Sequence, residues 1–113
     1  MKFSNPYLST TTKIQMIEQW VLVHSFLYYE ADSPIITDQQ FDHNSRQLAE
    51  ALRKYPKSAS QTRYSYCFEG YDGSTGHHLF GLLKNKDKRY IMDTAYSLLN
   101  MMQKQTKERR KIK

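Results

Sequence analysis

The sequence predicts a mainly α-helical fold: a helical hairpin followed by one or two further helices and a short extended, aromatic-rich segment. Two observations carry this prediction. Apolar residues recur every three or four positions in three separate stretches, as on the buried face of a helix. Helix-start signals and prolines bound the first two of these stretches and make them an adjacent pair.

The first helix is predicted to open at Thr12, because Thr12-x-x-Gln15 has the form of a capping box. It runs for about 18 residues and ends near residues 30–32, since Pro34 disfavours helical geometry in the residue before it. Its buried stripe consists of Ile14, Ile17, Trp20, Val21, His24, Leu27 and Tyr28.

The second helix is predicted to open with another capping box, Thr37-x-x-Gln40, and to stop at Pro56. Asp38 lies in its first turn, where the helix dipole favours a negative charge. One face carries Phe41, Ser45, Leu48, Leu52 and Tyr55. The turn at residues 33–36 is short, so the two helices should form a hairpin.

Residues 57–76 lack a helical pattern. Residues 63–68 alternate and are aromatic, which suits a short strand, but no partner strand is evident and we expect an extended crossing segment. A short helix is expected over residues 77–83, capped by Ser74, and a last helix capped by Asp87. The apolar stripe of that last helix is Tyr90, Ile91, Ala95, Leu98, Leu99 and Met102.

The net charge of +6 is concentrated at the C-terminus of this 113-residue chain. In residues 104–113, six basic side chains face one acidic one, Glu108, which leaves +5 there and +1 on residues 1–103. We therefore expect one small helical domain over 1–103 and a basic tail over 104–113. The tail is either a solvated terminus or a contact for DNA or RNA phosphates; its basic residues are Lys104, Lys107, Arg109, Arg110, Lys111 and Lys113.

Several function classes are disfavoured by composition. No apolar run is long enough for a membrane span, and the N-terminal residues lack the apolar core of a signal peptide, so a cytoplasmic protein is expected. The single Cys67 excludes an intrachain disulfide. The four histidines lack the spacing of metal ligands, and no nucleophile has a base at a recognisable spacing.

Residues 24–56 read HSFLYYEADSPIITDQQFDHNSRQLAEALRKYP. This stretch resembles the N-terminal domain Ia of bacterial NAD-dependent DNA ligases, the helical module that binds the nicotinamide mononucleotide (NMN) half of NAD. The resemblance lies in a pair of aromatic residues, a D-x-P-x-I-x-D turn, an aromatic-Asp pair and a closing proline. The residues in register are Phe26, Tyr28, Tyr29, Asp32, Pro34, Ile36, Asp38, Phe41, Asp42 and Pro56. It implies a ligase-Ia-like hairpin over residues 10–56.

The resemblance also implies a ligand site for NMN or NAD. Tyr28 and Phe41 match the aromatic pair that packs on the nicotinamide ring, and Tyr29 matches a His or Tyr position. Asp38 and Asp42 match carboxylates that hold ribose and amide groups. These residue types suit the chemistry, because a cationic ring favours aromatic faces and hydroxyls favour carboxylate acceptors. Phe41 replaces the commoner Tyr and so lacks its hydroxyl.

Catalysis by this chain is not expected. Adenylation in ligases needs the lysine of a K-x-D-G motif as nucleophile. The nearest match here, Gly70-Tyr71-Asp72-Gly73, has glycine at the lysine position and is more simply a turn.

Two hypotheses for function remain. In the first, the protein is a phage or mobile-element effector that reuses a ligase-Ia-like fold to bind and inhibit a host protein, such as a defence nuclease or an NAD-consuming enzyme. In the second, it is an NMN- or NAD-binding module or an accessory of DNA ligation or repair, with weak nucleic-acid binding through the basic tail.

Overall fold

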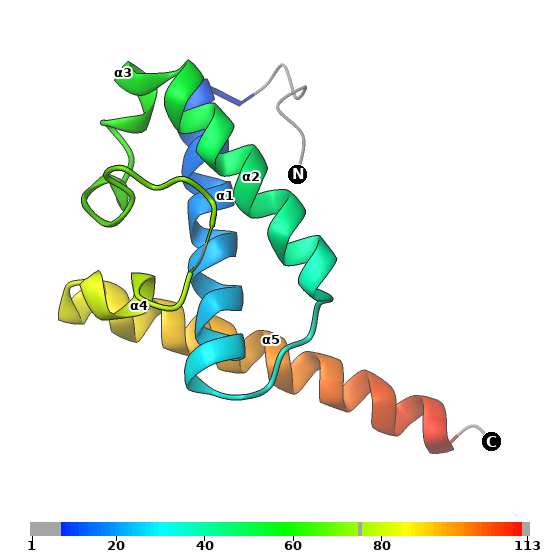
Figure 1. Cartoon of the computed structure of the whole chain (residues 1–113). Coiled ribbons are helices and arrows are strands. Elements are labelled where there is room, and N and C mark those ends of the chain that lie inside the picture. The colour runs from blue at the N-terminus through cyan, green and yellow to red at the C-terminus, as the bar shows by residue number, and fades with distance from the viewer. Residues whose placement is uncertain (1–7, 75, 112–113) are drawn as a thin grey trace.

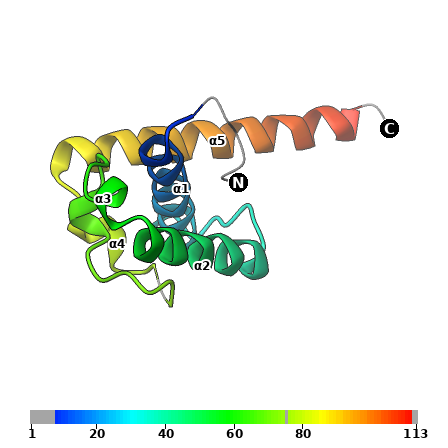
Figure 2. The same cartoon turned by 90° about the horizontal axis from the view of Figure 1, so that it is seen from above.

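The computed structural model describes residues 8–74 and 76–111, with side chains up to residue 105. Every regular element in these residues is helical, which confirms the predicted mainly α fold. Helix α1 (Thr10–Ser25) is central and contacts α2, α3, α4 and α5. Viewed along its axis, α1 lies between α5 and α2 (Figure 2).

The N-cap of helix α1 lies three residues earlier than predicted, at Ser9 rather than Thr12. The Ser9 hydroxyl accepts a hydrogen bond from the Thr12 amide at 3.1 Å, and Thr12 itself lies inside the first turn. At its C-terminal end, α1 continues into one π-helical turn, Phe26–Glu30. The helical path therefore ends where predicted, at Ala31, but through a wider turn than an α-helix has.

The helical hairpin is confirmed. Helix α2 (Asp38–Lys54) has the predicted capping box: the Gln40 amide donates to Thr37 Oγ1 at 3.0 Å, and the Thr37 amide donates to Gln40 Oε1 at 2.9 Å. It runs back antiparallel across α1 (Figure 1). In the turn between them, Asp32 has a φ of +49°, a left-handed conformation that Asp tolerates better than most residues.

The aromatic segment after the hairpin folds into local turns, so the predicted extended crossing segment is wrong. A four-residue helix, α3 (Pro56–Ala59), starts at the proline that ends α2. Turns and a 3₁₀ turn, Ser65–Cys67, then form local backbone hydrogen bonds, such as Cys67 N–H to Tyr64 O at 2.9 Å. Local turns satisfy backbone groups that a lone strand would leave unpaired.

Two of the expected caps are also wrong. Helix α4 (Leu79–Leu82) has no side-chain cap, and Ser74 bonds to Asp72 instead. Helix α5 (Asn85–Lys111) starts before Asp87, whose carboxylate accepts from Arg63 Nε at 2.9 Å and from the Tyr66 hydroxyl at 2.6 Å. Asp87 thus fastens the aromatic segment to α5 rather than capping the helix.

The core lies where α1 meets the other elements. Its fully buried side chains include Ile14, Val21, Leu22, Leu27, Leu48, Tyr64, Leu79, Ile91 and Ala95. Tyr28, Tyr90 and Met102, placed by periodicity on buried faces, are instead exposed. No helix in the described part of the chain is both long and apolar enough to cross a membrane.

The predicted basic tail is largely a continuation of α5, which reaches Lys111 and projects beyond the rest of the fold (Figures 1 and 2). Lys104 is exposed. The side chains of Lys107, Arg109, Arg110 and Lys111, and the whole of Lys113, lie outside the described residues.

Candidate functional site

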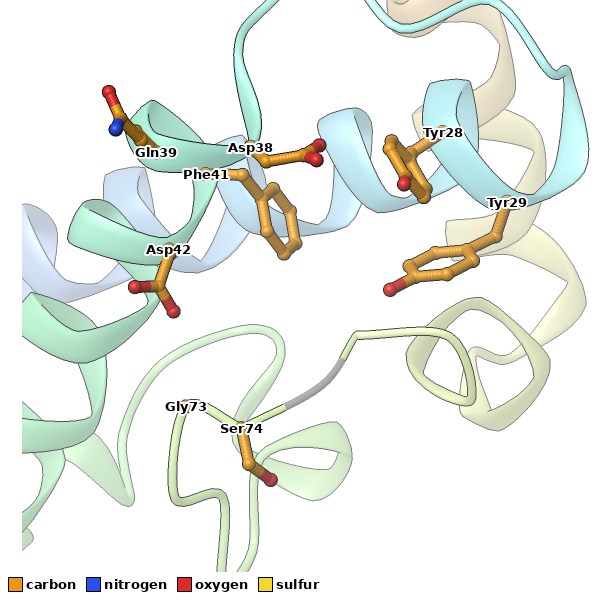
Figure 3. Close-up of a pocket in the computed structure, with 8 residues that line it drawn as sticks. All are labelled: Tyr28, Tyr29, Asp38, Gln39, Phe41, Asp42, Gly73 and Ser74. Atoms are coloured by element: carbon orange, nitrogen blue, oxygen red, sulfur yellow. The ribbon is translucent and has the colours of Figure 1, made fainter.

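A cavity of about 390 Å³ opens between the π turn, the start of α2 and the loop before α4. Figure 3 shows the side chains around it. The lining residues are Tyr28, Tyr29, Asp38, Gln39, Phe41, Asp42, Gly73 and Ser74. All five residues that the sequence places in a nucleotide site are therefore brought together around one cavity.

Aromatic faces make up one part of the lining. Tyr28 and Tyr29 come from the π turn, with ring centroids 4.7 Å apart and planes at 68°. Phe41 projects from the first turns of α2 into the space between them and the loop (Figure 3). A flat ring entering the cavity would meet aromatic surface from both helical elements.

The Phe41 ring is held from behind. It stacks on Trp20 with ring centroids 6.1 Å apart, and the Trp20 and His24 ring centroids are 4.4 Å apart. Burial lowers the pKa of His24 to about 4, because the surrounding apolar atoms disfavour the imidazolium. A neutral imidazole thus supports this aromatic stack at neutral pH.

Two carboxylates complete the helical side of the cavity. Asp38 and Asp42 are four residues apart on α2 and therefore share a face. In Figure 3 the Asp38 carboxylate points towards Tyr28, and that of Asp42 points towards the loop. Asp42 also pairs with Arg46 one turn further on, at 3.1 Å. Both carboxylates are exposed enough to accept hydrogen bonds from ligand hydroxyls.

The loop at Gly73–Ser74 forms the opposite wall, which sequence reasoning missed. Gly73 has a φ of +81°, and a Cβ on it would lie 3.0 Å from the Ser45 carbonyl oxygen. A Cβ on Gly76 would lie 2.5 Å from Ser25 Oγ and 3.1 Å from Phe41. Only glycines let the loop approach the hairpin this closely. The Asp72-Gly73 turn signal was visible in the sequence, but its place beside the hairpin was not.

Two other kinds of site, a metal site and a reactive cysteine, find no support in the described part of the chain. Among the residues the structure describes, no group of three or more His, Cys, Asp or Glu side chains is placed to hold a metal ion. Cys67 is buried, and that burial raises its thiol pKa to about 11, which disfavours the reactive thiolate.

Comparison with known proteins gives one family and one relative. Residues 8–62 match the family "DNA ligase-like, N-terminal NAD+-binding domain". A DNA ligase of Ehrlichia canis (strain Jake) is 32% identical over 74 residues, which is 66% of this chain and 10% of the ligase. No solved structure matches the chain significantly.

These matches confirm the predicted resemblance to ligase domain Ia. The chain spans about a tenth of the length of the ligase it matches. All five predicted site residues fall inside the family match, whereas Gly73 and Ser74 lie beyond it. The roles of the five residues remain predictions.

Proposed function

We propose that this chain is a nicotinamide-nucleotide-binding module that takes the NMN half of NAD into the cavity. The observation that carries the proposal is the convergence of Tyr28, Tyr29, Phe41, Asp38 and Asp42 on one concave surface. The similarity to the NAD+-binding domain of DNA ligases supports the same ligand class.

The chemistry of the cavity suits that ligand. Its volume of about 390 Å³ lies within the range of small-molecule sites. The oxidised nicotinamide ring is cationic and flat, so cation–π attraction to the faces of Tyr28 and Phe41 would stabilise it. Ribose hydroxyls and the carboxamide N–H groups are donors, and Asp38 and Asp42 offer ionised acceptors.

We further propose that the module binds without catalysing and serves a DNA-ligase-type reaction. The adenylated lysine would then belong to another domain or polypeptide, since Gly70 occupies the lysine position of the nearest motif. The match to an N-terminal domain family, and to only a tenth of a DNA ligase, supports this assignment. No observation on the described residues favours the effector hypothesis, with a host defence protein as partner, over this one.

Calorimetric titration with NMN and NAD, paired with thermal unfolding, tests the binding. Saturating ligand should raise the melting temperature by mass action. A ligand at a hundredfold excess over Kd stabilises the folded state by about 2.7 kcal/mol. Asp42→Ala should abolish the rise while leaving the unliganded protein folded, because the Asp42–Arg46 pair is exposed. Asp93→Ala on exposed α5 surface is the matched control and should bind normally. Wild-type protein that gives neither heat nor a melting shift at millimolar ligand contradicts the proposal.

Complementation tests the link to ligation. The region of the Ehrlichia canis ligase that matches this chain is deleted, and this chain is added in trans with NAD. We expect NAD-dependent adenylation of the truncated ligase to recover, and recovery to be lost with Asp42→Ala. Binding of NAD without any recovery contradicts the accessory role and leaves the binding module.

A further inference from the structure

We propose that the cavity, as this chain forms it, selects the nicotinamide nucleoside and disfavours the phosphate. The isolated protein should therefore bind nicotinamide riboside more tightly than NMN. This inference rests on the proposed function and specifies which part of the nucleotide the chain itself recognises.

The charges around the cavity carry the argument. Asp38 and Asp42 are the charged side chains among the described lining residues, and neither lysine nor arginine lines it. The guanidinium in contact with this set belongs to Arg46, which already bonds Asp42 and is 76% exposed. A cationic ring enters a region of complementary charge, whereas a phosphate dianion enters one of like charge.

The Ser74 part of the loop wall does not offer the donors that phosphate sites use. Such sites present free backbone N–H groups or a helix N-terminus to the anion. Here the Ser74 amide and hydroxyl both donate to the Asp72 carboxylate, at 2.9 and 2.6 Å, and the hydroxyl points away from the cavity in Figure 3. These bonds lower the pKa of Asp72, the residue that precedes Gly73 on the same loop.

One amide of the α2 N-terminus and its first turn are already occupied. The Gln40 amide is bonded by the Thr37 hydroxyl, and the Asp38 carboxylate occupies the first turn, where an anion would otherwise be attracted. Because the described lining residues include two carboxylates and no lysine or arginine, solvent cations or cations from a partner are better placed to neutralise a phosphate. The site is divided accordingly: this chain holds ring and ribose, and another surface neutralises the phosphate.

Titration of four ligands tests the division: nicotinamide riboside, NMN, NAD and reduced nicotinamide riboside, whose ring is neutral. At low salt we expect nicotinamide riboside to bind about tenfold more tightly than NMN, a ratio typical of one or two like-charge contacts. In about 0.5 M NaCl the ratio should shrink several-fold through screening. The reduced riboside should bind more weakly than the oxidised one, because it lacks the ring charge.

Asp38→Asn should reduce the preference for nicotinamide riboside over NMN, and Asp93→Asn, on the exposed surface of α5, should leave it unchanged. Both changes conserve size, and Asp38 is exposed, so folding is retained. NMN binding as tightly as the riboside, or a ratio insensitive to salt and to Asp38→Asn, overturns this inference while the proposed function stands. Failure of all four ligands to bind contradicts the proposed function itself.

Discussion

Glu18 is a carboxyl group with no exposed surface on the core-facing side of α1. Burial raises its pKa from 4.5 to about 7, because apolar surroundings disfavour the carboxylate, and the nearby Thr62 side chain offsets only part of this rise. Neither carboxyl oxygen has a partner within ordinary hydrogen-bond geometry. The first helix therefore contains an acid that costs stability once it must ionise.

Glu18→Gln should stabilise the protein above neutral pH. Between pH 4.5 and about 7 the unfolded chain loses this proton before the folded one does, so the free energy of unfolding falls as pH rises. The full penalty, on the order of 3 kcal/mol, is present above that window and absent below it. Urea unfolding of both proteins at pH 4.5 and pH 8 measures the difference. An equal effect of the substitution at the two pH values contradicts this assignment.

His24 has the opposite effect on how the free energy of unfolding depends on pH. Its pKa falls from 6.5 to about 4 in the folded state, so stability is lost as pH falls through that window. In wild-type protein the two groups oppose each other between pH 4.5 and 6.5. Removing the Glu18 carboxyl should therefore expose a rise in stability with pH that the wild type does not show.

Gly76 is the residue on which the fit of the loop depends most. In Gly76→Ala the new Cβ meets buried Ser25 Oγ at 2.5 Å and the Phe41 ring at 3.1 Å, so the loop or the ring must move. We expect a loss of about 1–3 kcal/mol in stability and several-fold weaker NMN binding. Gly81→Ala is the control: nothing lies within 4 Å of its Cβ position in α4, so stability should stay level or rise slightly. Equal behaviour of the two variants contradicts the close approach.

At the scale of the elements, helices fixed by local signals were predictable and the connection between them was not. The 3.6-residue period and the Thr37–Gln40 box define the hairpin from neighbouring residues alone. The segment 57–84 depends on distant partners, such as the Arg63 amide on Gln15 Oε1 at 2.9 Å and Tyr66 on Asp87. The alternating aromatic residues 63–68 suggested extended structure, since a local pattern carries no information about such distant partners.

The candidate site divides in the same way. Its five hairpin residues follow from the spacing of one motif, and the structure places all of them around the cavity. Gly73 and Ser74 come some thirty residues later in the chain, and only the close packing of the loop on Ser45 brings them there. A wall made by tertiary contact leaves no short-range pattern in the sequence.

The end of α5 allows a test of the basic segment. Deleting residues 104–113 removes a net charge of +5 and keeps Leu99, the last half-buried apolar residue among the side chains that the structure describes. The melting temperature should therefore change by only a few degrees. If this segment contacts nucleic acid, wild-type affinity for DNA falls steeply with salt, and the deletion flattens that dependence. Absence of DNA binding at low salt contradicts that role. If the protein lacking residues 104–113 is unfolded, the prediction that the fold does not need this segment is wrong.

At the scale of the whole molecule, α1 connects stability to the site. Its buried stripe contacts every other helix, and its continuation as a π turn delivers Tyr28 and Tyr29 to the cavity. The antiparallel return of α2 places Phe41, Asp38 and Asp42 opposite them. The later part of the chain then packs a loop against this hairpin. The motif residues of the hairpin and the later loop thus line one cavity.

The central claim is that nicotinamide nucleotides occupy this cavity, and an NMR titration of ¹⁵N-labelled protein with NMN tests it most directly. We predict that amide shifts move for residues 28–29, 38–42 and 73–74, with little change along α5. The nicotinamide protons should move upfield as the ring stacks between Tyr28 and Phe41. Shift changes confined to the groove between α1 and α5, which includes Met16 and Leu98, or none at saturating NMN, would contradict the account.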